Sequence, residues 1–180
     1  MTRAIFIAIL TATLAAFGGL AAACDGGGGD ALTLEEYFAR FEEIDQNVDQ
    51  EIEALFADFP ESEEEFFSNE ENLPLVQDLF AGFPRVLGDA LDELRGVEPP
   101  SEVEEAHEAF LGAGDELLAG FESAADQVAD VDSISEVEAI NASVEPEIMP
   151  LEAQFDAACL DLVAIGTENG ITVAVSCEDE

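Results

Sequence analysis

Residues 33–59 read TLEEYFARFEEIDQNVDQEIEALFADF, and this stretch decides the fold class. Thr33 and Glu36 form a capping-box pattern at its start, and Pro60 is expected to end it. The stretch therefore predicts an amphipathic helix of about seven turns, whose apolar face needs a partner. The apolar side chains recur every three or four positions: Leu34, Tyr37, Phe41, Ile44, Val48, Ile52, Leu55 and Phe59.

A second stretch with helical spacing covers residues 75–94. Pro84 lies inside it, and a proline removes one backbone hydrogen bond and collides with the preceding turn. We therefore expect a kink or a break near residues 80–83. Residues 61–73, which come before this helix, are rich in acids and predict a loop or a short helix laid across the others.

Two more helices follow along the chain. Ser101, with Glu104 three positions later, is the expected start of a third helix that continues to Val128. Either Ser133 or Ser135 opens a fourth helix, because each has a glutamate three positions later.

The end of the chain changes its pattern. Pro146 and Pro150 are candidate breaks in the fourth helix, and residues 151–165 then continue as a last helical stretch. Asn169 and Gly170 supply the left-handed positions that stop a helix. After them, apolar and small polar residues alternate over residues 171–177, which predicts an extended tail.

Amphipathic helices joined by short polar connections predict how the chain packs. We expect an all-α fold, an up-and-down antiparallel bundle of about four helices with a short extended C-terminal tail. Residues 32–180 are expected to form this one acidic domain.

The charge of the chain bears on its partners and on its stability. The sequence holds 43 Asp and Glu residues, four Arg and no Lys, and its formal net charge is -39. Nucleic acid is excluded as a partner, because binding a phosphate backbone needs lysine and arginine to displace counterions. We further expect self-repulsion to make the folded state more stable in salt and in mild acid.

The N-terminus has the three parts of a secretory signal. Arg3 is followed by an apolar run over residues 4–20, and three alanines then precede Cys24. The segment LAAAC at residues 20–24 resembles the lipobox of bacterial lipoproteins, with leucine four places before the cysteine rather than three. The resemblance implies that residues 1–23 are a signal peptide and that Cys24 is acylated.

Acylation of Cys24 would set the location of the whole protein. Acyl chains on this cysteine would hold the chain at a cell membrane on the extracytoplasmic side. Residues 24–31, with four consecutive glycines, would then serve as a flexible tether to the folded domain.

Cys159 and Cys177 remain after Cys24 has been assigned to the lipid. Export places both in an oxidising compartment, and a tail folded against the last helix can bring the two sulfur atoms together. We expect a disulfide, which by loop closure would stabilise the fold by about 3 kcal/mol. Metal binding or redox chemistry by the two thiols is disfavoured, because no Cys-x-x-Cys pair or nearby histidine accompanies them.

His107 is the single histidine of the chain, and it follows Glu104 at the spacing of a Glu-x-x-His element. Di-iron bundles need two such elements and further glutamates, so that site is excluded. We expect a partly buried histidine near Phe110 and Val103 at the edge of the bundle. A cation site made by Glu104, His107 and a carboxylate of another helix is the weaker alternative.

Residues 150–177, together with residues 99–107, resemble a group of uncharacterised acid-rich helical lipoproteins from high-GC bacteria. The resemblance implies a surface-anchored helical domain and supplies no catalytic residues. No complete catalytic constellation or cofactor motif is evident, so we expect a structural or protein-binding role, with a protein partner at the cell surface, rather than an enzyme. The alternative is a lipoprotein that binds small molecules or, diffusely, divalent cations through its surface carboxylates.

Overall fold

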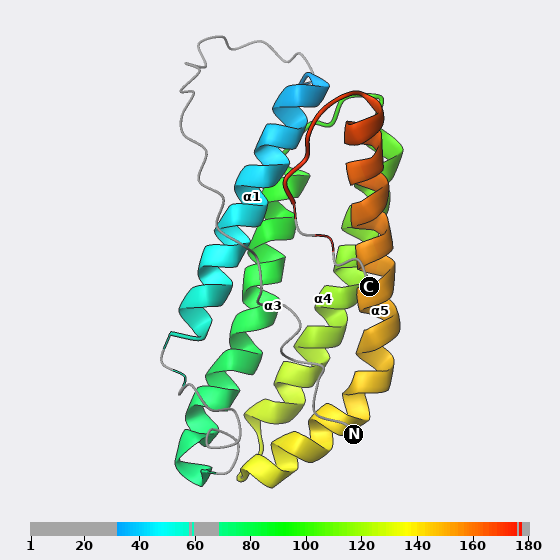
Figure 1. Ribbon diagram of the computed structural model, residues 1–180. Helices are drawn as coiled ribbons and strands as arrows, with labels where there is room; N and C mark the ends of the chain where they lie inside the picture. The colour runs from blue at the N-terminus through cyan, green and yellow to red at the C-terminus, as the bar shows by residue number, and fades with distance from the viewer. Residues whose placement is uncertain (1–31, 58, 60–68, 176, 178–180) are drawn as a thin grey trace. The chain divides into compact units, whose positions relative to one another are not determined.

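The computed structural model describes residues 32–57, 59, 69–175 and 177. Consecutive long helices run antiparallel (Figure 1), so the expected all-α, up-and-down bundle is confirmed. The described part of the chain contains four long helices and one short 3₁₀ helix: α1 (Leu34–Leu55), η1 (Glu70–Asn72), α3 (Leu73–Arg95), α4 (Glu104–Ala129) and α5 (Ile134–Glu168).

Two of the predicted helix starts are confirmed and one is wrong. Thr33 and Glu36 form both hydrogen bonds of a capping box at the start of α1. Ser133, rather than Ser135, caps α5 by accepting a hydrogen bond from the backbone N–H of Glu136. Ser101 caps nothing, because its hydroxyl is bonded to the neighbouring Glu102 and α4 begins only at Glu104.

The predicted end of the first helix needs correction. Helix α1 ends at Leu55, one turn before Phe59, because the backbone turns at Phe56. The rings of Phe56 and Phe83 pack edge to face there, which joins this turn to α3. Pro60, which was expected to end the helix, lies outside the described residues.

The helices do not break at their prolines, so the break that was one alternative near residues 80–83 and the breaks expected at Pro146 and Pro150 are wrong. Helix α3 is continuous through Pro84, and α5 is a single helix of 35 residues that passes through both Pro146 and Pro150. Pro146 and Pro150 are exposed, so backbone carbonyls that lose a partner can be hydrated by water. A proline inside a helix costs about 3 kcal/mol, and apolar packing on both sides of it offsets that cost.

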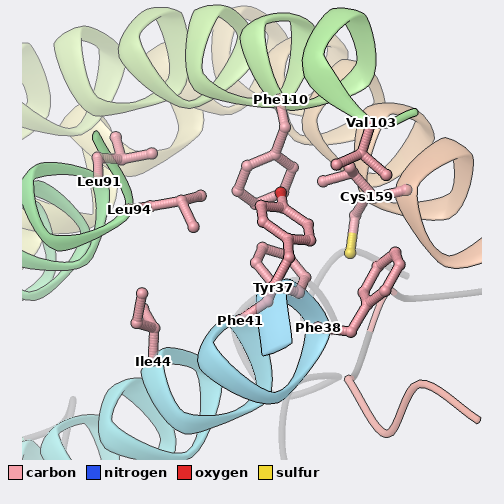
Figure 2. Packing of buried hydrophobic residues seen from close by; sticks show 10 residues of the cluster. Tyr37, Phe38, Phe41, Ile44, Leu91, Leu94, Val103, Phe110 and Cys159 are labelled. Carbon is pink, nitrogen blue, oxygen red and sulfur yellow. The ribbon is translucent and has the colours of Figure 1, made fainter. Parts of the chain in front are cut away.

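The core consists of two clusters of buried side chains. The larger one lies around Tyr37, Phe41 and Phe110, where side chains of α1, α3, α4 and α5 meet (Figure 2). The smaller one, at the other end, joins Val76 of α3 to Val128 and to Ile134 at the start of α5. The helices are therefore held together at both ends by apolar burial.

Polar contacts fix the connection between α4 and α5. The side-chain amide of Gln77 donates to the backbone carbonyls of Val128 and Ala129 at the end of α4 and of Val131 just beyond it. The carboxylate of Glu70 accepts a hydrogen bond from the first backbone N–H of α5 at 3.0 Å. Both side chains satisfy backbone groups that a helix end leaves without partners.

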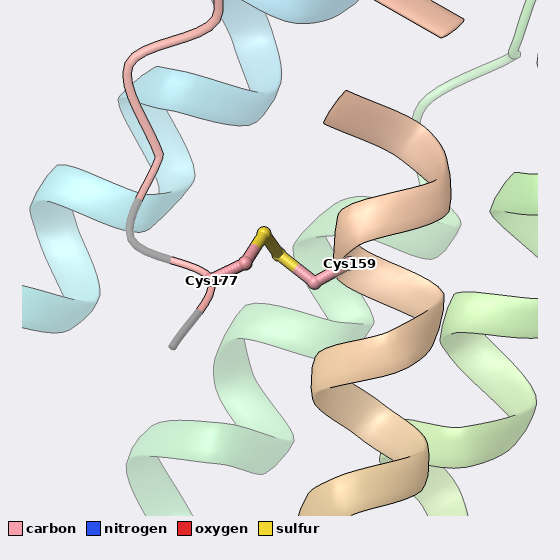
Figure 3. The surroundings of a disulfide bond; sticks show 2 residues. All are labelled: Cys159 and Cys177. Atoms are coloured by element: carbon pink, nitrogen blue, oxygen red, sulfur yellow. A yellow bond between two sulfur atoms is a disulfide. The ribbon is translucent and has the colours of Figure 1, made fainter. Parts of the chain in front are cut away.

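The extended tail completes the fourth side of the bundle. The closely packed helix pairs are α1 with α3, α3 with α4, and α4 with α5. Within the described residues α1 and α5 do not form such a pair, and residues 171–175 and Cys177 run between them (Figures 1 and 3). The side chains of the tail alternate between half-buried and exposed positions, as the sequence pattern predicts.

Candidate functional site

The lipidation sequence at residues 20–24 and the tether at residues 24–31 lie outside the described residues. Acylation of Cys24 therefore stays a prediction from the sequence. No described helix combines the length and the apolar composition that a membrane span needs.

Cys159 and Cys177 are joined by a disulfide (Figure 3). Cys159 is buried on α5 among the side chains of the larger cluster, and Cys177 is half-buried at the end of the tail. Their Cα atoms lie 5.7 Å apart, which is an ordinary span for a disulfide. The bond attaches the end of the tail to Cys159, which lies a few turns before the C-terminal end of α5.

His107 lies deeper than the sequence suggests. Only 4% of its surface is exposed, and it does not lie partly buried at the bundle edge. Its Nδ1 atom lies 3.0 Å from the hydroxyl oxygen of Tyr37, which is completely buried on α1. The two rings also meet edge to face, with their centroids 5.7 Å apart. Tyr37 and His107 thus form a polar pair inside the apolar core.

Burial changes the acid-base chemistry of both rings. It raises the pKa of Tyr37 well above its usual value of 10, because the phenolate would lose its hydration. Burial also lowers the pKa of His107 below 6.5, and the nearby charge of Glu108 only partly opposes this effect. Both rings are therefore neutral at pH 7, and the tyrosine hydroxyl can donate to Nδ1 when the ring proton is on Nε2.

Sequence reasoning placed Tyr37 only in an apolar stripe and did not pair it with His107. The signal that could have found the pair is the presence of one tyrosine and one histidine, each on the apolar face of its own helix. A buried hydroxyl and a buried imidazole each need a hydrogen-bond partner, so two such residues favour each other.

The weaker alternative of a cation site at Glu104 and His107 gains no third ligand. Glu104 is exposed at the start of α4, whereas His107 is buried and bonded to Tyr37. Across the described ranges, no three side chains of His, Cys, Asp or Glu are grouped so that they could hold a metal ion.

The arginines of the described chain all take part in ion pairs between helices. These pairs are largely exposed, so each contributes only about 0–1 kcal/mol. They connect α1 with α3 and α3 with α4. The positive charges of the described arginines are therefore paired with carboxylates of the bundle itself. The pairs across helices are Arg40 with Glu93, Arg85 with Glu51, and Arg95 with Asp115.

A shallow hollow of about 610 Å³ lies along the second half of α4. Its carboxylates are those of Glu122, Asp126 and Asp130, which follow one another every four residues on one helix face. A second hollow of about 340 Å³ adjoins it at the α4–α5 connection and shares Asp130. Both are open to solvent, so they can attract cations but do not shield a bound molecule from water.

No protein-family model, curated protein or solved structure matches this chain. The assignment of a function therefore depends on the sequence and on the arrangement of the described residues.

The lowered pKa of His107 predicts a loss of stability in acid. Below pH 6.5 the unfolded chain takes up a proton that the folded chain resists, so the free energy of unfolding falls as the pH falls. In a His107→Gln variant this contribution is absent. Urea unfolding at pH 7, 6 and 5 should therefore show the advantage of the wild type over the variant shrinking with each step. An advantage that stays constant or grows in acid would contradict the prediction.

Proposed function

We propose that this chain is a lipid-anchored protein on the extracytoplasmic side of a cell membrane, and that its helical bundle has a structural or protein-binding role. The anchor rests on the sequence at residues 20–24, and the Cys159–Cys177 disulfide supports export to an oxidising compartment. The chain then presents its bundle on a tether of a few residues above the membrane.

The observation that carries the binding role is the distribution of charge. The described arginines are paired within the bundle, whereas the carboxylates along α4 face solvent in open hollows. A surface of this kind attracts a protein partner with clustered lysines and arginines, and it repels other acidic proteins. Such an interaction should weaken steeply as salt is added.

Catalysis is not part of the proposal. An acid-base or nucleophilic mechanism needs a titratable group that can reach a substrate. The one histidine of the chain is buried against Tyr37, which favours a packing role for it.

Diffuse binding of divalent cations is the second candidate function. It is favoured by the column of Glu122, Asp126 and Asp130, whose carboxylates lie one helical turn apart along the hollow. Calorimetry with calcium and magnesium tests it, and heats indistinguishable from dilution in both titrations would reject it.

The anchor is tested with a Cys24→Ser variant. If Cys24 is acylated, this change should abolish labelling by a fatty-acid probe and move the protein from the membrane fraction to the soluble fraction. Cys177→Ser is the matched control, because it removes a cysteine but leaves the lipidation sequence intact. Equal membrane retention of the Cys24→Ser variant and the wild type would reject lipid anchoring.

A further inference from the structure

The tail, described at residues 171–175 and at Cys177, is held by its side chains, and none of these described residues belongs to a β-sheet. Its alternate residues are half-buried and pack against the larger core cluster, whereas Thr172 and Ala174 between them are exposed. The inward side chains are those of Ile171, Val173, Val175 and Cys177. This alternation is typical of an extended segment that lies on an apolar surface.

The surface that receives the tail is made by α1 and α5 together. Gly166 of α5 leaves room for the side chains of Val173 and Phe38, and a Cβ atom at this position would collide with both. From α1, the carboxylate of Glu42 accepts a hydrogen bond of 2.7 Å from the backbone N–H of Ala174. The tail therefore bridges two helices that do not pack closely on each other.

The two ends of the tail are fixed in different ways. At its start Gly170 has a φ of 77°, a conformation that glycine adopts readily, and the N–H of Ile171 donates to the carbonyl of Gly166 at 2.9 Å. At its other end the tail is held covalently by the disulfide to Cys159 (Figure 3). Between these points, the backbone hydrogen bond from Ala174 to Glu42 and the inward side chains keep the tail in place.

We infer that this tail is a redox-released strap that closes the side of the bundle between α1 and α5. Cross-linking holds the tail next to its seat at high effective concentration, so few contacts suffice to keep it bound. Without the cross-link, the contacts of the inward side chains alone must offset the conformational entropy of ordering the whole tail. The tail then leaves its seat while the four helices remain packed.

The chemistry is a thiol–disulfide exchange with an external dithiol. A thiolate of the dithiol attacks the sulfur of Cys177, which is more exposed than that of Cys159, and Cys159 leaves as a thiolate. The second thiol of the reductant then closes a disulfide with the first and releases Cys177. Two electrons pass to the protein, and the dithiol is oxidised. Release of the tail exposes the surface around Phe38 and Gly166 on which Val173 lies.

Limited proteolysis of the full chain with elastase tests the inference, since this protease cuts after small apolar residues such as those of the tail. Dithiothreitol should raise the rate of cleavage within residues 170–177 at least tenfold, while cleavage within α3 and α4 changes less than twofold. Cys177→Ser should show the faster cleavage without any reductant. Mass spectrometry after reduction locates each cut.

A matched pair of variants distinguishes the contribution of the tail's inward side chains from the contribution of the disulfide. Val173→Asp places a charge among the inward side chains and should speed cleavage of the tail in the oxidised protein, whereas Thr172→Asp places it on the exposed side and should change the rate less than twofold. Equal rates for these two variants in the oxidised protein would overturn the seating of the tail. A tail that is cut no faster after reduction, or a rise that extends equally to α3 and α4, would overturn the strap.

Discussion

The melting temperature of this protein at pH 7 should rise by about 10 °C between 0.05 M and 1 M sodium chloride. Removal of the expected signal peptide, residues 1–23, which hold one arginine and no acid, would change the formal net charge from -39 to -40. The screening length falls from about 14 Å to about 3 Å over this range of salt, so repulsion between carboxylates on neighbouring helices is largely removed. Calorimetric melts at several salt concentrations measure the effect.

A charge-reduced variant is the control for general effects of salt on apolar burial. Glu122→Gln combined with Asp126→Asn removes two exposed carboxylates from the column on α4 without changing side-chain size. The variant should melt at a higher temperature than the wild type in 0.05 M salt, and the difference should shrink in 1 M salt. Melting temperatures that stay flat with salt would show that self-repulsion does not limit the stability of the bundle.

Leu162→Ala should lower the free energy of unfolding by about 2–5 kcal/mol. Leu162 lies on α5 beyond both of its prolines, and none of its surface is exposed. Its removal takes apolar contacts from the larger cluster and leaves a cavity that the four helices can fill only in part. Equilibrium unfolding in urea at pH 7 and in constant salt gives the change directly.

Leu160 provides the matched control for this substitution on the same helix. Its surface is 37% exposed, so Leu160→Ala should cost well under about 1 kcal/mol. The comparison also tests the register of α5, because a shift of the helix by two residues would bury Leu160 and expose Leu162. Similar losses of stability in the two variants would contradict the packing of this half of α5.

The pH dependence of stability combines two opposing effects. The sequence leads us to expect that mild acid stabilises the folded chain by relieving repulsion among its carboxylates. The structure adds His107, whose lowered pKa makes the folded state lose stability below pH 6.5. Comparison of the wild type with His107→Gln isolates the second effect from the first.

The sequence by itself determined the fold class, because helical spacing of apolar residues and capping patterns are local properties. The capping box at Thr33 and the alternation of the tail are read from neighbouring residues, and both are present in the structure. The charge, and with it the expectation that nucleic acid is not a partner, also follows from the composition alone.

The tertiary structure decided what local rules could not. A proline disfavours a helix locally, but packing along the rest of α5 offsets the cost at Pro146 and Pro150. Tyr37 and His107 are separated by 70 positions and meet only because α1 faces α4 across the larger cluster. The tail fills the space between α1 and α5 because these helices do not pack closely on each other. Each of these outcomes depends on contacts between residues far apart in the chain, which no short stretch of sequence contains.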